Sequence, residues 1–361
     1  MKKILQVMTI MNRGGAETMV MNYYRALDKS RYQFDFLVHR QERGAYEDEI
    51  ERMGGRIIRA MPIRPGNYFR YFKFLDDFFR EHADEYIAIH AHIQENSGFA
   101  FKYAAKYGIR NRLSTSHIAS VSYDLKYPFR LYAQMYLKKY VTVRLSCGKD
   151  AGRAMYGRKP FMVMQNAVDT AAFAFNEETS IEVREEFGLG NSLVIGNTSR
   201  VCHRKNHLFM VEILAEMLKI RPDTKMVFLG ENSEKNMLTA VIDRYNLQDH
   251  ILFLGARGDV NRIVQAYDVF LFPSLWEGLP VAVVEAQAAG LQCFLSDTID
   301  RQTDITGDVT FLSLSLSAAQ WAERILAGVP YPRHDNRKKL IDAGYDVHHN
   351  IERLLSLYTA Q

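Results

Sequence analysis

The sequence predicts an α/β fold of two doubly wound parallel sheets, one in each half of the chain. The 361 residues are enough for two domains of ordinary size. Short β-branched runs alternate with helical segments, and this alternation restarts after residues 161–169. We therefore expect one domain over residues 1–165 and a second over 166–340. A last helix within 341–361 is expected to return to the first domain.

The predicted elements follow one another in the order that a parallel sheet requires. In the first half, strands are expected at 2–10, 32–39, 56–61, 86–93, 112–118 and 141–148, and helices at 16–27, 46–54, 97–108 and 150–157. In the second half, strands are expected at 193–200, 225–231, 250–257, 268–274 and 292–297, and helices at 207–219, 259–267, 280–289, 318–328 and 348–358.

Composition narrows the class of protein. Hydrophobic residues make up 47% and charged residues 24%, values typical of a soluble globular protein. No run of eighteen apolar residues predicts a membrane span. Residues 1–15, MKKILQVMTIMNRGG, indicate a first strand rather than a signal peptide. The 3 cysteines are odd in number and far apart, which favours a reducing cytoplasm over a disulfide framework or zinc site.

The net charge of +4 hides an asymmetry between the halves. Residues 1–165 contain 28 Lys and Arg against 16 Asp and Glu, so the remainder of the chain is acidic. No nucleic-acid-binding signature accompanies the basic half, and nucleic acid is not expected as a partner. An anionic membrane surface or a phosphorylated acceptor fits the basic half better. In residues 64–82 and 127–144, Tyr and Phe are interleaved with Arg and Lys, as in helices that lie on a membrane surface. Ordinary amphipathic helices packed on a sheet remain an equal alternative.

One apolar stretch, PSLWEGLPVAVVEAQAAG at residues 273–290, carries two glutamates. Pro280 suits the first position of a helix and Gly290 the position just past its end. The valines and alanines between them leave no polar face, which predicts a helix buried on all sides. A buried carboxylate costs several kcal/mol unless it is paired. Glu285 therefore requires a partner, either inside the protein or on a ligand.

Other candidate residues follow predicted strands of the second half, where doubly wound folds bind ligands. Arg200 and Lys205 lie in a strand-to-helix loop and suit a diphosphate, although a solvated basic loop explains them equally well. The backbone amides of Gly278 and Leu279 precede a helix and can meet phosphate oxygens. Glu277 would repel phosphate, so we expect it to accept hydroxyls of a sugar or to cap the helix.

The first half offers weaker signals. Gly14 and Gly15 after the first strand can bring backbone amides close to a ligand, or form a simple tight turn. His117 ends a predicted strand, where a structural role is the commoner one. His90 and His92 could share a strand face, but no third ligand is apparent, so no metal site is expected.

Taken together, the motifs NRGGAE, SRVCHRKNH, DVFLFPSLWEGLPVAVVEAQAAGL and SDTI resemble the retaining glycosyltransferases of family four, which have the GT-B fold. The likeness covers nearly the whole chain and is greatest to bacterial exopolysaccharide and capsule enzymes. It implies two Rossmann-like domains that face each other across a cleft. It departs from the family at Ala167, where members often have glycine in the interdomain linker.

The resemblance also implies roles for individual residues. Arg200 and Lys205 match the positions that hold the donor diphosphate, Glu285 the one that binds the nucleotide ribose, and Glu277 the one that contacts the transferred sugar. His117 matches a histidine near the donor sugar, and Gly15 a loop that approaches the phosphate. Arg257 matches a position that meets the base. The implied protein is cytoplasmic, or peripheral on the inner face of the cell membrane.

The expected reaction moves a sugar from a nucleotide donor, a UDP-sugar, to a membrane-associated glycan or lipid-linked acceptor. No Asp-x-Asp sequence is present to hold a donor-bound metal, so cations and helix amides are expected to neutralise the leaving diphosphate without a cofactor. The family's same-face attack implies retention. Two alternatives stay open: a sugar-nucleotide epimerase of the same fold, and a silent nucleotide-sugar-binding protein. A dehydrogenase is disfavoured because no G-x-G-x-x-G follows the first strand.

Overall fold

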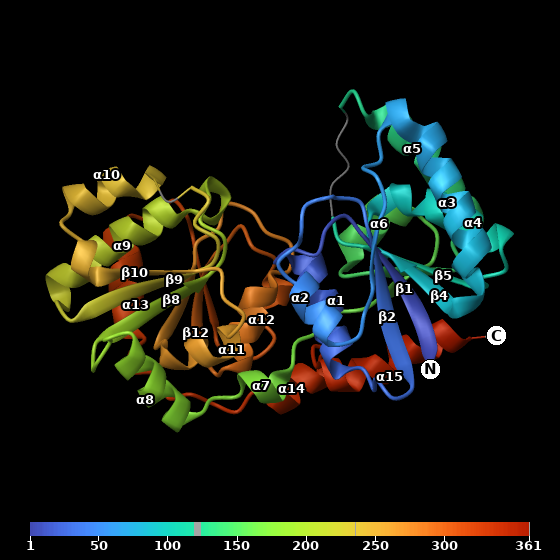
Figure 1. The fold of residues 1–361 in the computed structure, drawn as a ribbon. Coiled ribbons are helices and arrows are strands. Elements are labelled where there is room, and N and C mark those ends of the chain that lie inside the picture. Colours follow the sequence, from blue (N-terminus) through green and yellow to red (C-terminus); the bar gives the residue numbers. More distant parts are fainter. Residues whose placement is uncertain (119–123, 235, 361) are drawn as a thin grey trace. The chain divides into compact units, whose positions relative to one another are not determined.

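The computed structural model describes residues 1–118, 124–234 and 236–360, which form two compact units. Unit 1 contains Met1–Ala167 and Val347–Gln361, and unit 2 contains Val168–Asp346. Each unit is a parallel β-sheet with helices on both faces (Figure 1). The predicted α/β class with two doubly wound sheets is confirmed.

Unit 1 has a seven-stranded sheet in the order β3-β2-β1-β4-β5-β6-β7. The strands are β1 (Lys2–Met8), β2 (Tyr32–Val38), β3 (Ile57–Arg59), β4 (Tyr86–Ala91), β5 (Asn111–Ser116), β6 (Val143–Ser146) and β7 (Met162–Val163). The helices are α1 (Gly15–Ala26), α2 (Glu47–Arg52), α3 (Tyr68–His82), α4 (Ser97–Lys106), α5 (Tyr127–Tyr140), α6 (Lys149–Tyr156) and α15 (Val347–Thr359).

Successive side chains along the strands of unit 1 point to opposite faces of the sheet, and each face packs against a different set of helices. Ile4 and Met8 of β1 pack with α1 and α15, whereas Leu5 and Val7 pack on the opposite face with α3, α4 and α5. The last helix, α15, thus supplies part of the core of the unit in which the chain begins (Figure 1). Gln6 shares the α15 face with Ile4 and Met8, and it is a polar residue with an exposed fraction of only 1%.

Unit 2 has a six-stranded sheet in the order β10-β9-β8-β11-β12-β13. The strands are β8 (Leu193–Thr198), β9 (Thr224–Leu229), β10 (Ile251–Gly255), β11 (Val269–Phe272), β12 (Gln292–Ser296) and β13 (Val309–Leu312). The helices are α7 (Thr170–Phe173), α8 (Glu177–Glu186), α9 (His207–Ile220), α10 (Asn236–Arg244), α11 (Val260–Ile263), α12 (Val281–Ala288), α13 (Ala318–Ala327) and α14 (Arg337–Asp342). The sequence did not predict β13, which has four residues and is only partly buried.

The unit boundaries lie close to, but not at, the expected ones of 165/166 and 340/341. Unit 2 extends to Asp346 because α14 packs against α7 and the Val168 amide donates to the Tyr345 carbonyl. At the other boundary, Asn22 donates to the carbonyl of Ala167 within unit 1. Ala167 is not among the residues with positive φ, so alanine adopts this conformation without strain.

Candidate functional site

The chemistry-bearing residues of unit 2 lie where its parallel strands end. Arg200 and Lys205 follow β8, Arg257 follows β10, and Glu277 follows β11. In the sheet, β8 lies between β9 and β11. Because the strands are parallel, the loops that follow β8, β9 and β11 lie at the same edge of the sheet. At this edge the backbone of Gly230, after β9, approaches the loop after β8 so closely that a Cβ on Gly230 would lie 2.1 Å from the Ser199 carbonyl oxygen.

Two contacts hold the loop after β8 against the loop after β11. Asn206 has left-handed backbone angles, with φ of 61°, and its side chain donates to the Pro273 carbonyl at 3.1 Å. The Leu275 amide donates to the Arg204 carbonyl at 2.9 Å. Asparagine tolerates positive φ better than most residues, so it suits this turn into α9. Sequence reasoning missed Asn206, although an asparagine directly before a helix is a usable signal.

These contacts place Lys205 beside Glu277. Lys205 Nζ lies 2.6 Å from Glu277 Oε1, which makes the two side chains a close ion pair. The side chains of Lys205 and Glu277 are only 12% and 8% exposed, and Lys205 Nζ also lies 4.5 Å from the centroid of the Phe272 ring. Burial lowers the pKa of Lys205, and the adjacent Glu277 carboxylate opposes that shift. The pair is thus a largely desolvated cation and anion at the strand ends.

Arg200 is the more solvent-exposed of the two predicted cations. Its side chain is 59% exposed and its Nε lies 3.4 Å from Oε2 of Glu231, which is also exposed. An exposed ion pair of this kind contributes little to stability. An anionic ligand can therefore bind the Arg200 guanidinium at a small free-energy cost. To bind Lys205, the ligand must displace the buried Glu277 carboxylate.

The helix that carries Glu285 is one residue shorter at its start than expected. Pro280 is the residue before the first turn and α12 begins at Val281, whereas Gly290 follows the helix with φ of +70° as its position requires. Gly278 is exposed, and a Cβ there would meet nothing within 4 Å, so this backbone is open to a ligand. Leu279 is partly buried against the core of unit 2. The Glu285 side chain is buried, with the residue 9% exposed.

Gln287, the other polar residue of α12, is fully buried as well. Gln287 donates to the carbonyls of Val283 and Thr303 and accepts from the amides of Ile305 and Thr306. All its hydrogen-bonding capacity is used inside the protein, so it fixes α12 to the loop before β13.

Arg257 is held by its own loop. Its Nε and Nη2 donate to the two Asp259 carboxylate oxygens at 2.9 and 2.8 Å, and its guanidinium lies over the Phe187 ring. This bidentate pairing orients the side chain without the ligand base that the resemblance implies.

In unit 1, Gly15 begins α1 and a Cβ there would meet nothing within 4 Å. His117 follows β5, and its Nε2 lies 2.9 Å from Nδ1 of His92. His90 and His92 do share a sheet face, and their rings form hydrogen bonds to other side chains. Among the described residues, no group of three or more His, Cys, Asp or Glu side chains could hold a metal ion.

Comparison with known proteins identifies the family. EpsF of Bacillus subtilis, which is assigned as a glycosyltransferase, is 35% identical over 99% of this chain and 96% of its own length. Residues 180–346 match the family model described as glycosyl transferases group 1. The chain belongs to the group 1 glycosyltransferases. The capsular polysaccharide biosynthesis glycosyltransferase CapH of Staphylococcus aureus is a further relative, at 24% identity over 92% of both chains.

Solved structures show that this glycosyltransferase has the GT-B fold. HepE of Anabaena, solved with UDP and glucose, superposes with a TM-score of 0.77 at 16% identity over 100% of both chains. A glycosyltransferase of Rickettsia africae gives a TM-score of 0.76 at 18% identity, covering 99% of this chain and 97% of its own. At these identities the likeness concerns the fold alone. The predicted family and the predicted GT-B fold are both confirmed.

Proposed function

We propose that this glycosyltransferase transfers a sugar from a UDP-sugar to a membrane-associated glycan or lipid-linked acceptor in exopolysaccharide, capsule or envelope synthesis. The observation that carries the proposal is the buried Lys205–Glu277 pair at the strand ends of unit 2, in which Lys205 comes from the same loop as the exposed Arg200. Two cations suit a diphosphate, and a carboxylate beside them suits sugar hydroxyls. The UDP and glucose bound to HepE support a UDP-sugar donor. The relative CapH, named for capsular polysaccharide biosynthesis, supports a polysaccharide product.

The proposed chemistry uses the chain's own charges. A diphosphate that contacts Arg200 competes with Glu277 for Lys205, and both cations then neutralise the negative charge that develops on the leaving group. The carboxylate of Glu277, released from Lys205, accepts hydroxyl hydrogens of the sugar. Glu285 accepts from the two adjacent ribose hydroxyls, and the amides of Gly278 and Leu279 meet phosphate oxygens. On unit 1, Gly15 and His117 are assigned to the same substrate by resemblance. We further propose that transfer retains configuration by same-face attack and requires no metal.

Release of UDP from UDP-sugars tests this function directly. We expect release only when a lipid-linked or glycan acceptor is added, and we expect the rate to survive EDTA because Arg200 and Lys205 supply the positive charge. Release without any acceptor, with isomerised sugar, would indicate the epimerase. Binding of UDP-sugar without release would indicate a nucleotide-sugar-binding protein. Activity that EDTA abolishes and manganese or magnesium restores would contradict the metal-independent mechanism.

Unit 1 carries the surface that we propose for the membrane. Several large apolar side chains are exposed on α3, on α5 and just before α5, with Leu125 at 95%, Phe69 at 83% and Met135 at 67%. The start of α3 lies beside α5, since the Tyr68 and Tyr132 ring centroids are 6.0 Å apart. Lys and Arg side chains of the same helices accompany these apolar residues. Within the part of the chain that is described, no helix is long and apolar enough to cross a bilayer.

Binding to anionic vesicles should therefore require both charge and apolar contact. We expect binding to weaken as salt rises, because exposed charges are screened over about 10 Å at 0.1 M salt. Leu125→Ser combined with Met135→Ser should lower vesicle partitioning by about tenfold or more, since each buried side chain contributes about 1.5–3 kcal/mol. The matched control is Ile181→Ser with Ile220→Ser, which removes two exposed apolar side chains from unit 2. Equal binding to neutral and anionic vesicles, or to neither, would refute a membrane surface here.

A further inference from the structure

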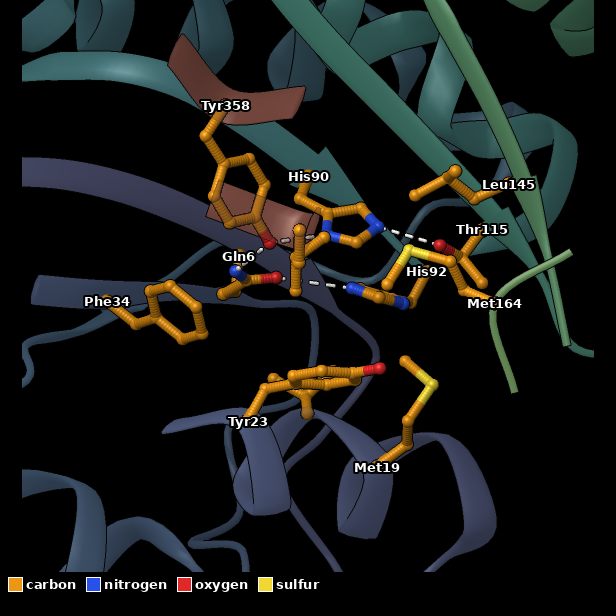
Figure 2. A pocket seen from close by; sticks show the side chains of 12 residues that line it. Gln6, Met19, Tyr23, Phe34, His90, His92, Thr115, Leu145, Met164 and Tyr358 are labelled. Atoms are coloured by element: carbon orange, nitrogen blue, oxygen red, sulfur yellow. Dashed lines mark hydrogen bonds between the residues drawn. The ribbon is translucent and has the colours of Figure 1, made fainter. Parts of the chain in front are cut away.

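A row of buried polar side chains crosses the sheet of unit 1 beneath α15. Gln6 comes from β1, His90 from β4 and Thr115 from β5, while His92 follows β4 and Tyr358 belongs to α15 (Figure 2). Their exposed fractions range from 0% for Tyr358 to 8% for His92. The sheet face around them is apolar, so each polar atom needs a partner within the row.

The partners form one continuous chain of hydrogen bonds. Gln6 Nε2 donates to the Tyr358 hydroxyl at 3.2 Å, and Gln6 Oε1 lies 3.2 Å from His92 Nε2. On one side of Gln6, the Tyr358 hydroxyl lies 2.7 Å from His90 Nδ1, and His90 Nε2 lies 2.7 Å from Thr115 Oγ1. On the other side, His92 Nδ1 lies 2.9 Å from His117 Nε2. The chain ends at Nδ1 of His117, which is buried and has no hydrogen-bond partner among the described residues.

The imidazole rings of His90, His92 and His117 are neutral at ordinary pH. Burial lowers the pKa of His90 to about 3 and that of His117 to about 4, and burial also lowers the pKa of His92 well below its usual range. A neutral imidazole has one nitrogen that donates and one that accepts. The position of one proton in this chain therefore determines the position of the others.

The side-chain amide of Gln6 determines which nitrogen of each histidine donates along this chain of hydrogen bonds. Its Oε1 only accepts, so His92 carries its proton on Nε2 and has a bare Nδ1. His117 must then donate to that bare nitrogen from Nε2, which leaves its own Nδ1 without a proton. The opposite direction would end the chain in a buried N–H without an acceptor, and orphaned N–H groups are rarer than under-satisfied acceptors.

We propose that Gln6, acting through His92, fixes His117 in the Nε2–H tautomer, so that Nδ1 accepts a hydrogen bond from a hydroxyl of the sugar substrate. This inference rests on the proposed function, which assigns His117 to the donor sugar. His117 directly follows the carboxyl end of β5, the edge at which doubly wound sheets bind ligands. Gln6 and His92 are positioning residues, and only His117 is assigned a contact with substrate.

The tautomer can be measured without turnover by ¹⁵N NMR of histidine-labelled protein, with His117 assigned through His117→Gln. We expect the His117 spectrum to show a protonated Nε2 and a bare Nδ1. His39 is an internal reference of the opposite kind, because its Nδ1 lies 2.7 Å from the Met8 carbonyl and must donate. A His117 spectrum that matches the His39 pattern would overturn the inference, whatever the enzyme transfers.

The variant Gln6→Met keeps the length of the side chain and removes its polarity. We expect it to mix the His117 tautomers and to lower kcat/KM for the sugar donor by about tenfold, the scale of one neutral hydrogen bond. The dissociation constant of UDP, which lacks the sugar, should stay within about twofold. An unchanged tautomer or an unchanged kcat/KM in this variant would contradict the positioning role. If the wild-type protein binds no UDP-sugar, the proposed function is refuted, but the tautomer measured by NMR is unaffected.

Discussion

Replacing Lys205 by alanine is expected to slow sugar transfer by about a hundredfold or more, because it removes a largely desolvated charge from the developing diphosphate. Arg200→Ala should cause a loss of similar size. The two variants should differ in stability. Lys205→Ala leaves the buried Glu277 carboxylate with Arg204 Nη1 at 3.6 Å and should lower the free energy of unfolding by about 1–3 kcal/mol. Steady-state kinetics and thermal unfolding on the same samples give both quantities.

A double variant separates catalysis from folding at this site. Adding Glu277→Gln to Lys205→Ala removes the buried carboxylate charge that has lost its lysine, and should restore part of the lost stability. It should not restore transfer, since the cation is still missing. Lys219→Ala is a control for losing a lysine, because Lys219 pairs with Glu216 on the exposed side of α9. Recovery of transfer together with stability in the double variant would show that Lys205 serves only to pair Glu277.

Changing Glu285 to glutamine should weaken UDP binding by about 1–3 kcal/mol while the protein stays folded. The residue is 9% exposed on a helix of mainly valine and alanine, so a ribose that it contacts is bound away from bulk water. Glutamine keeps the shape, but a charged acceptor forms hydrogen bonds roughly twice as strong as a neutral one. Titration calorimetry with UDP on both proteins measures the difference.

The 2′-deoxy analogue of UDP is the matched ligand control. It lacks one of the two hydroxyls, so its affinity should differ less between wild type and Glu285→Gln. Unchanged UDP affinity in the variant, with a large fall in melting temperature, would assign Glu285 a structural role instead. Gln287 shows what such a role looks like on the same helix, since its bonds to Val283, Thr303, Ile305 and Thr306 all lie inside the protein.

Much of this site can be located from the amino-acid sequence because its signals are local. The valines and alanines around Glu285 specify a buried helix over a few turns, and Gly290 marks the end of that helix through its positive φ. Arg200, Lys205 and Glu277 each follow a β-branched or aromatic run. Parallel strands end at one edge of their sheet, so these residues could be expected to lie together.

The sequence by itself therefore determined the two βαβ series, the residues at their strand ends and the carboxylate on an apolar helix. Only the tertiary structure decided which polar atoms face one another. Lys205 pairs with Glu277 because Asn206 and Leu275 join two loops that follow different strands. Gln6, His90, His92 and Tyr358 form one hydrogen-bonded chain because β1 pairs with β4 and α15 returns across both. Strand order and the path of a returning helix depend on contacts between distant segments, which the local periodicity of a sequence does not encode.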